Sequence, residues 1–141
     1  MSVPITVPAL SQFPCFVGLS RDEATTLSRR LTPVESTPDQ ILFRQGEPGG
    51  VIYLVLSGEV EVRLQLQDGR ERVVSVLGPG SFLGEISFLL GTTRSATAAV
   101  RTPGQLWMLG DDDLYEGIAL GEAWAQQLLH VMAQGLARLG I

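Results

Sequence analysis

Residues 82–100 read F-L-G-E-I-S-F-L-L-G-T-T-R-S-A-T-A-A-V, an apolar and small-residue stretch that carries one acid, Glu85, and one base, Arg94. A glycine precedes the acid and a serine follows the base. Burying a charged side chain costs free energy unless an opposite charge or a ligand compensates it. The two charges therefore indicate either an ion pair that closes the loop or a polar ligand that both side chains contact.

The residues beside Glu85 predict a short helix whose start can hold an anion. Residues 85–90 are long enough for one to two helical turns, and the first backbone N–H groups of a helix, here near Ile86 and Ser87, have no partner within it. Gly84 has no side chain, so an outside group can approach the backbone closely. This arrangement predicts an anion site.

Arg94 and its neighbour add charge and a hydroxyl to this site. A guanidinium binds two oxygens of a phosphate or a carboxylate at once, and the Ser95 hydroxyl offers a further hydrogen bond. Glu85 repels a bare phosphate but accepts a hydrogen bond from a hydroxyl group. A ribose phosphate supplies both groups.

Outside this segment, short apolar runs alternate with turns. In residues 59–66 apolar and polar side chains alternate, which predicts a strand with one buried face. Asp68-Gly69 predicts a hairpin whose two central residues both have positive φ. The expected strands are residues 41–44, 51–56, 59–66, 72–77 and 96–100. This spacing predicts a mainly β fold, either a β-roll or a barrel.

Helices are expected on both sides of the strands. Ser20 and Glu23 have the spacing of a capping box, so a helix starts there and ends before Pro33. The acids at 111–113 are interpreted as the cap of a helix rather than a metal site, because no second cluster of oxygen ligands accompanies them. Residues 1–13 are expected to form an extended or flexible arm before the folded domain, residues 14–141.

A last helix is expected over about residues 122–139, and its apolar arc is wide enough for two partners. One stripe would lie on the roll and the other on a second copy of the chain, which predicts a homodimer. His130 falls on the polar side and is expected to be solvated. The first stripe holds Trp124, Leu128 and Val131, and the second holds Ala125, Leu129, Met132, Leu136 and Leu139.

Composition narrows the classes of function. The chain has 141 residues, 45% of them hydrophobic, and a formal net charge of −5, which argues against a nucleic-acid surface. It has one cysteine, Cys15, which is expected to be a buried, unreactive thiol. No apolar run reaches the ~18 residues of a membrane span, so no membrane contact and a cytoplasmic location are expected.

Residues 82–100 resemble the phosphate-binding cassette of cyclic nucleotide-binding domains, the module shared by the bacterial catabolite activator protein, protein kinase A regulatory subunits and nucleotide-gated channels. C-F-V-G-L-S at residues 15–20 resembles the entry to the first helix of that family. L-F-R-Q-G-E-P-G-G-V-I-Y-L-V-L-S-G-E-V-E-V at residues 42–62 resembles its glycine-punctuated strand pair. The resemblance covers about residues 13–139 and implies a mainly β fold with flanking helices, a jelly-roll-like β-roll of the double-stranded β-helix type.

The resemblance implies a role for each charged residue. Glu85 would accept a hydrogen bond from the ribose 2′-hydroxyl, and Arg94 would pair with the cyclic phosphate. The N–H groups near Ile86 and Ser87 would cradle that phosphate, and Gly84 would permit its close approach.

The ligand implied by the resemblance is cAMP or cGMP, with no metal and no cofactor. Ser95 stands where some members have alanine and others threonine, and a hydroxyl there is associated with guanine in some of them, so the preference for cAMP is weak. The base would stack under an apolar lid from the last helix, for which Trp124, Leu128 and Val131 are the candidates.

Two functions follow, a cyclic-nucleotide sensor that acts on an unknown effector protein, and a dimerisation module that has lost its ligand. No catalytic residue is expected, because a metal-dependent enzyme on a similar roll needs several histidine and carboxylate ligands, whereas His130 is alone on a helix. The sequence reaches Ile141 without a basic recognition helix, so the sensor is expected to lack a DNA-binding output domain.

Overall fold

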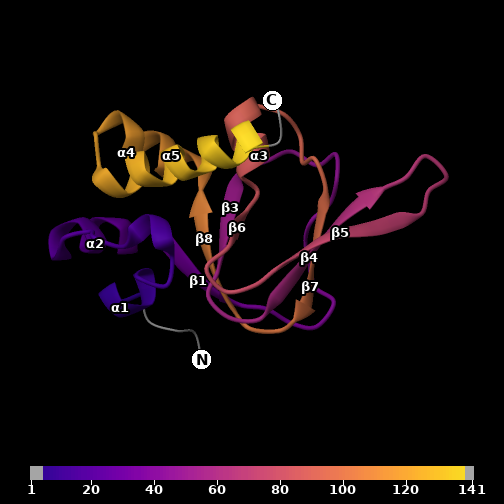
Figure 1. The fold of residues 1–141 in the computed structure, drawn as a ribbon, viewed down its shortest axis with the longest axis horizontal. Helices are drawn as coiled ribbons and strands as arrows, with labels where there is room; N and C mark the ends of the chain where they lie inside the picture. The colour runs from indigo at the N-terminus through magenta and orange to yellow at the C-terminus, as the bar shows by residue number, and fades with distance from the viewer. Residues whose placement is uncertain (1–4, 139–141) are drawn as a thin grey trace.

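The computed structural model describes residues 5–138, which form two antiparallel β-sheets with helices gathered on one side (Figure 1). Hydrogen-bonded neighbours follow the order β1-β8-β3-β6 in one sheet and β2-β7-β4-β5 in the other. The mainly β fold predicted above, a roll with flanking helices, is confirmed. The strands are β1 (Leu31–Glu35), β2 (Ile41–Phe43), β3 (Val51–Val55), β4 (Glu59–Gln65), β5 (Glu71–Leu77), β6 (Phe82–Leu83), β7 (Thr97–Thr102) and β8 (Gln105–Gly110).

All helices except α3 lie on the side of the first sheet that faces away from the second (Figure 1). Helix α3 lies at one end of the roll and contacts α5. The helical segments are α1 (Val7–Leu10), a 3-10 turn η1 (Pro14–Phe16), α2 (Arg21–Ser28), α3 (Glu85–Leu90), α4 (Asp111–Ala119) and α5 (Ala123–Arg138).

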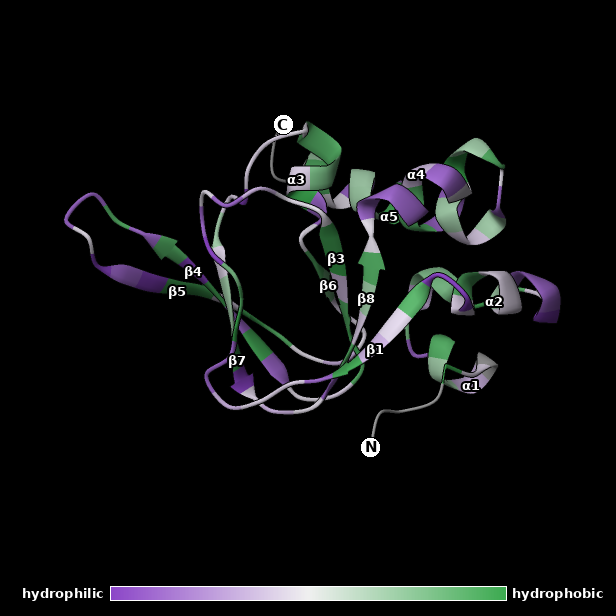
Figure 2. Cartoon of the chain, turned by 180° about the vertical axis from the view of Figure 1, so that it is seen from behind, coloured by the Kyte–Doolittle hydropathy of each residue, from purple (hydrophilic) through white to green (hydrophobic). Residues whose placement is uncertain are grey.

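Alternation along the first sheet divides the interior into two apolar clusters. Ile52 and Leu54 of β3 face the helices, whereas Val55 faces the second sheet. Strands β3 and β6, strongly hydrophobic in Figure 2, lie between the helices and the second sheet. We call the cluster on the helix side the helical core; its largest fully buried side chains are Trp107, Trp124, Phe13, Phe16, Leu10, Leu27, Ile52, Leu54, Leu109, Leu114 and Leu128. The roll core is Val55, Val60, Leu83, Ala98 and Leu106.

Residues 7–13 are not the extended arm that was expected. They form α1 and the turn after it, and Ala9, Leu10 and Phe13 are buried in the helical core. The Phe13 ring lies 5.7 Å from that of Trp107, measured between centroids. Pro8 lies in the first turn of α1, where its missing N–H breaks no helical hydrogen bond. The spacing of apolar side chains therefore outweighs the prolines here.

The N-terminal capping box is confirmed. Ser20 Oγ accepts a hydrogen bond from the Glu23 N–H at 3.1 Å, and a Glu23 carboxylate oxygen accepts one from the Ser20 N–H at 2.8 Å. Helix α2 ends at Ser28, before Pro33 as expected. Pro33 itself lies in β1, at the edge of its sheet, where a missing N–H is tolerated.

The hairpin predicted at Asp68-Gly69 joins β4 and β5, but its turn differs from the expected one. Gly69 has a φ of +86°, whereas Asp68 is not among the described residues with positive φ. The Gly69 N–H donates to the Leu66 carbonyl at 3.0 Å. A type I turn followed by a left-handed glycine accounts for this geometry.

The helix predicted to start at residues 111–113 is confirmed, but none of the three acids is its N-cap. Gly110 is the N-cap of α4 and makes no side-chain cap, so all three acids lie within the first helical turn. Acids in that turn are stabilised by the helix dipole. Asp113 pairs with Arg30 at 3.1 Å. Within the described part of the chain, no cluster of three acidic, histidine or cysteine residues could hold a metal ion.

Helix α5 matches the predicted final helix as far as Arg138, and Leu139 lies outside the described residues. His130 is exposed, as expected. Burial raises the pKa of the Cys15 thiol to about 11, in line with an unreactive side chain. Between residues 5 and 138, none of the helices combines the length and apolar character that a membrane crossing requires.

Candidate functional site

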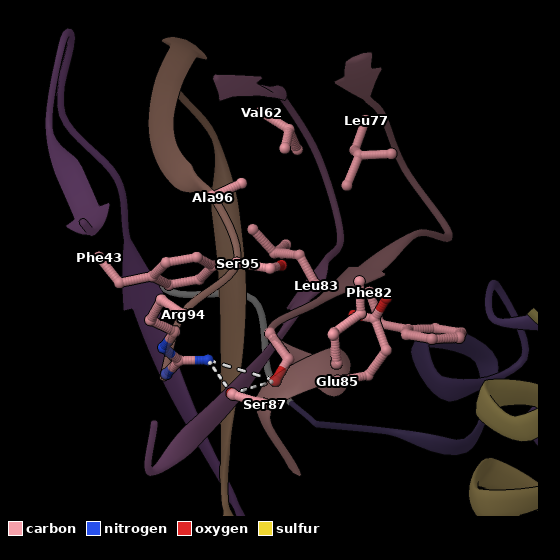
Figure 3. A pocket seen from close by; sticks show the side chains of 12 residues that line it. Phe43, Val62, Leu77, Phe82, Leu83, Glu85, Ser87, Arg94, Ser95 and Ala96 are labelled. Atoms are coloured by element: carbon pink, nitrogen blue, oxygen red, sulfur yellow. Dashed lines mark hydrogen bonds between the residues drawn. The ribbon is translucent and has the colours of Figure 1, made fainter. Parts of the chain in front are cut away.

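A pocket of about 90 Å³ lies inside the roll, at the end that carries α3 (Figure 3). Phe43 of β2, Val62 of β4 and Leu77 of β5 form apolar parts of its wall. The structure brings all six residues predicted as ligand contacts into the same lining, namely Gly84, Glu85, Ile86, Ser87, Arg94 and Ser95.

Gly84 is the N-cap of α3 and has a left-handed backbone conformation. Its φ is +92°, a left-handed value that side chains other than glycine rarely adopt. A Cβ at this position would lie 2.6 Å from Arg94 Nη1 and 2.8 Å from the Val51 carbonyl oxygen. The absence of a side chain at Gly84 therefore leaves room for Arg94 and for the Val51 carbonyl, whereas the predicted approach of a ligand remains a prediction.

Arg94 lies at the base of the pocket and is only 6% exposed. Its Nη2 donates to the Val51 carbonyl at 2.8 Å, and its Nη1 donates to the Gly84 carbonyl and to Ser87 Oγ, both at 3.2 Å. The guanidinium carbon lies 4.1 Å from the centre of the Phe43 ring, and Figure 3 shows the ring beside it. These contacts fix the guanidinium plane against α3.

The charge of Arg94 is not neutralised by direct contact. Among residues 5–138, no carboxylate oxygen lies within 4.0 Å of its nitrogens, and its Nε has no hydrogen-bond partner. Burial lowers the pKa of Arg94, while the more distant charges of Asp111, Tyr53, Glu47 and Glu85 oppose this effect. A buried cation with an unused donor is a site prepared for an anion.

Glu85 is half-buried at the first position of α3. Burial raises its pKa, and the nearby charge of Arg94 reduces that increase. The two side chains interact through space without forming an ion pair, so the alternative in which they close the loop by pairing with each other is not what the structure contains. A hydrogen bond from its own backbone N–H also reduces the increase in the pKa of Glu85.

Ser87 and Ser95 offer their hydroxyl groups in different ways. Ser87 is 7% exposed, and its Oγ donates to the Gly84 carbonyl at 3.1 Å, so the structure already uses it. Ser95 is exposed at the rim of the pocket. Only the Ser95 hydroxyl is therefore open to an incoming group.

The predicted roles of α5 need correction. Trp124 and Leu128 have no exposed surface and belong to the helical core, so they cannot cover the pocket. Ala125 and Met132, two members of the predicted dimer stripe, are buried in the same core because their face of α5 packs on the protein's own helices and sheet. Val131 is half-buried and does not line either cavity beside α3.

A second cavity of about 210 Å³ shows which part of α5 adjoins the pocket. Met132, Gly135 and Leu136 of α5 form one side of it, and Glu85 and Ile86, which also line the first pocket, form the other. The wide apolar arc of α5 contained no signal for which residues face α3. Sequence reasoning likewise missed Phe43, although alternation in β4 had indicated the buried face that contains Val62.

Comparison with known proteins matches the part of the chain that contains this pocket. The family described as Cyclic nucleotide-binding domain matches residues 33–119. The CRP-like cAMP-activated global transcriptional regulator of Mycobacterium tuberculosis (strain CDC 1551 / Oshkosh) is 31% identical over 123 residues, which cover 87% of this chain and 55% of that protein. The chain spans about half the length, or less, of the curated relatives that it matches.

Solved structures agree with the fold. The N-terminal domain of a transcriptional regulator from Streptomyces coelicolor A3(2) matches with a TM-score of 0.75 and 30% identity, covering 94% of this chain and 92% of that one. The regulatory domain of Toxoplasma gondii protein kinase A, crystallised with cAMP, matches with a TM-score of 0.69 and 32% identity, covering 78% of this chain and 42% of that one.

Proposed function

Since the chain belongs to the cyclic nucleotide-binding domain family, we propose that it is a sensor that binds a cyclic nucleotide, preferring cAMP to cGMP, and that it acts through an effector rather than by catalysis. Arg94 pairs with the cyclic phosphate, and Glu85 accepts a hydrogen bond from the ribose 2′-hydroxyl. The N–H groups of Ile86 and Ser87 contact the phosphate at the start of α3.

The observation that carries this proposal is the state of Arg94. Its guanidinium is 6% exposed, lines the pocket and lacks a carboxylate within 4.0 Å among the described residues. Keeping a buried charge without a direct counter-ion costs free energy. A ligand phosphate removes this cost, whereas a purely structural role for the pocket gives no reason to keep the charge.

The dimensions of the pocket indicate how the ligand is placed. A volume of about 90 Å³ is below the range of about 300–1,000 Å³ that is typical of ligand sites, so the pocket holds the ribose phosphate only after it widens. The adjoining cavity of about 210 Å³ between α3 and α5 is mostly apolar and takes the base. Met132 and Leu136 therefore replace Trp124 and Leu128 as the proposed contacts of the base.

The preference for cAMP rests on a narrower argument. Ser95 is exposed at the pocket rim, and a hydroxyl there can bond to the phosphate or to a guanine amino group. The groove between α3 and α5 offers the base apolar side chains from both helices. An adenine needs fewer polar partners than a guanine in such surroundings, so we propose cAMP as the preferred ligand.

The alternative, a ligand-free dimerisation module, has weaker support. Of its predicted interface, Ala125 and Met132 are buried in the protein's own core, and Leu129 and Leu136 are half-buried. The polar groups of the pocket are retained together, although a module without a ligand would not need them. A homodimer through the half-buried part of α5 remains compatible with the sensor.

Calorimetric titration with cAMP and with cGMP tests the proposal. We expect binding of cAMP in the micromolar range or tighter and weaker binding of cGMP. Arg94→Ala should reduce the affinity for cAMP by about 2–5 kcal/mol, which is more than tenfold, because it removes one partner of a buried charge pair. Arg101→Ala, at a side chain that is 53% exposed, is the control and should bind as the wild type does.

A second comparison isolates Glu85. Glu85→Ala should weaken binding of cAMP more than binding of its 2′-deoxy analogue, because only the ribonucleotide has the hydroxyl. Equal losses for the two nucleotides refute the role of Glu85. No heat with either cyclic nucleotide at high concentration refutes the sensor itself.

A further inference from the structure

The carboxylate of Asp111, the first residue of α4, lies behind the nucleotide pocket. The Asp111 N–H donates to the Gly50 carbonyl at 2.9 Å, which fixes the start of α4 to the segment before β3. A Cβ on Gly49 would lie 2.8 Å from Ser87 Oγ and 3.8 Å from Asp111 Oδ2. Ser87 lines the pocket, whereas Asp111 does not. The two side chains therefore meet at Gly49, with Ser87 on the pocket side.

Asp111 is also the acidic group that acts most strongly on Arg94. Burial lowers the pKa of Arg94, and among the charges that oppose this lowering Asp111 has the largest effect. Burial raises the pKa of Asp111 in turn, and Arg94 reduces that increase. Because Ser87 bonds to Arg94 at 3.2 Å, the carboxylate acts on the guanidinium from beyond Ser87 and not by direct contact.

Two unused polar atoms remain in this arrangement. Oδ1 of Asp111 is buried and has no hydrogen-bond partner among the described residues, and the same holds for Nε of Arg94. Leaving a buried polar group without a hydrogen bond costs free energy. Asp111 therefore compensates the charge of Arg94 only in part, and both groups gain from a change in their surroundings.

We propose that Asp111 is an internal counter-charge that competes with the nucleotide phosphate for Arg94 and so couples binding to the start of α4. This inference rests on the proposed function of the pocket. A phosphate on Arg94 brings a second anion near Asp111 in surroundings of low dielectric constant, where like charges repel strongly. The repulsion is relieved when the carboxylate moves away, and the first turn of α4 moves with it.

The packing of α4 carries this movement further. A Cβ on Gly117 of α4 would lie 2.5 Å from the Trp124 ring and 3.0 Å from the Ala125 side chain of α5. Such close packing leaves α4 no room to shift without α5. Asp111 thus connects the phosphate, through α4, to α5, which borders the cavity proposed for the base.

Asp111→Asn tests the competition, because asparagine keeps the shape of the side chain and removes its charge. We expect the variant to bind cAMP about tenfold more tightly than the wild type by calorimetry, within the usual range of coupling between sites, about 5- to 150-fold. Asp112→Asn, which removes an exposed charge one residue away, should change the affinity less than about twofold. Unchanged or weaker binding by Asp111→Asn overturns the proposal.

Amide hydrogen exchange provides a readout that a merely structural role would not change. Addition of cAMP to the wild-type chain should alter protection in residues 111–116, and this difference should disappear in Asp111→Asn although the variant still binds. An identical difference in both proteins overturns the coupling. If the wild type binds no cyclic nucleotide, the proposed function has failed, whereas tight binding with no effect of Asp111→Asn removes only this inference.

Discussion

The helical core and the roll core of this protein differ in the size of their side chains and in how completely those side chains fill the space. Trp107, Trp124, Phe13 and Phe16 are at most 2% exposed and fill the space between the helices and the first sheet. The roll core relies on smaller and branched side chains and leaves a pocket of about 90 Å³ beside them. One region is filled with large aromatic rings, and the other is left partly open.

The distribution of polar groups follows the same division. The buried polar side chains are Ser87 in α3, Arg94 in the segment before β7, and Thr97 at the start of β7. The helical core buries apolar side chains, with the indole N–H groups of Trp107 and Trp124 as its unpartnered polar atoms. Because burial of aromatic surface outside the roll supplies much of the stability, the roll interior can keep the buried charge of Arg94 without a direct counter-ion.

The largest expected effect tests where the stability resides. Trp124→Ala should reduce the free energy of unfolding by about 3–5 kcal/mol, because it removes a fully buried ring from the helical core. Urea denaturation followed by circular dichroism measures this loss. The control, Leu120→Ala, changes a side chain that is 66% exposed and should stay within about 0.5 kcal/mol of the wild type. A loss below about 1 kcal/mol for Trp124→Ala would contradict the claim that the helical core supplies much of the stability.

The roll side was the easier of the two to predict from the sequence. Gly84, Glu85 and Arg94 belong to one continuous segment, and their chemistry requires a turn, a helix start and a cation within ten residues. The alternation in β4 likewise identified its buried face without knowledge of its neighbours. These patterns come from residues that are close together in the chain, so a single sequence is enough to recognise them.

The helical side depends on contacts between distant segments, which the sequence does not display. Strands β1, β6 and β8 were not assigned from the sequence, and each of them pairs with a strand that is distant from it in the chain. The apolar arc of α5 was visible, but its partners in η1 and α2 were not, so Trp124 was mistaken for a lid. Asp111 was interpreted only as part of a helix start, because the sequence does not show that the fold brings it close to Ser87, which is far from it in the chain.

Two glycine-to-alanine substitutions, one in α4 and one in α5, compare a closely packed position with an open one. Gly117→Ala should lower the free energy of unfolding by about 1–3 kcal/mol, because its Cβ would overlap the Trp124 ring. Gly135→Ala should raise it by about 0.5–1 kcal/mol, because no atom lies within 4 Å of that Cβ and alanine favours the helix. Chemical denaturation of both variants gives the comparison directly. Changes of the same sign would mean that α4 and α5 are not packed as closely as described.

The smallest expected effect concerns Glu85 on the roll side, whose buried charge lowers the stability of the folded protein. Burial raises the pKa of Glu85 in the folded state above its unfolded value, so the folded protein binds this proton more readily. The stabilisation that comes with protonation is complete below the unfolded pKa, about 4.3, and is lost as the pH rises through the folded value. At pH 7 Glu85→Gln should therefore raise the midpoint of thermal unfolding of the ligand-free protein, and the difference should disappear in acid.

The control is Glu71→Gln, at a side chain that is 46% exposed, which should leave the midpoint of thermal unfolding unchanged at both pH values. A lower midpoint for Glu85→Gln at pH 7 would show that the charge of Glu85 stabilises the empty pocket, and the roll core would then not differ from the helical core in the way proposed.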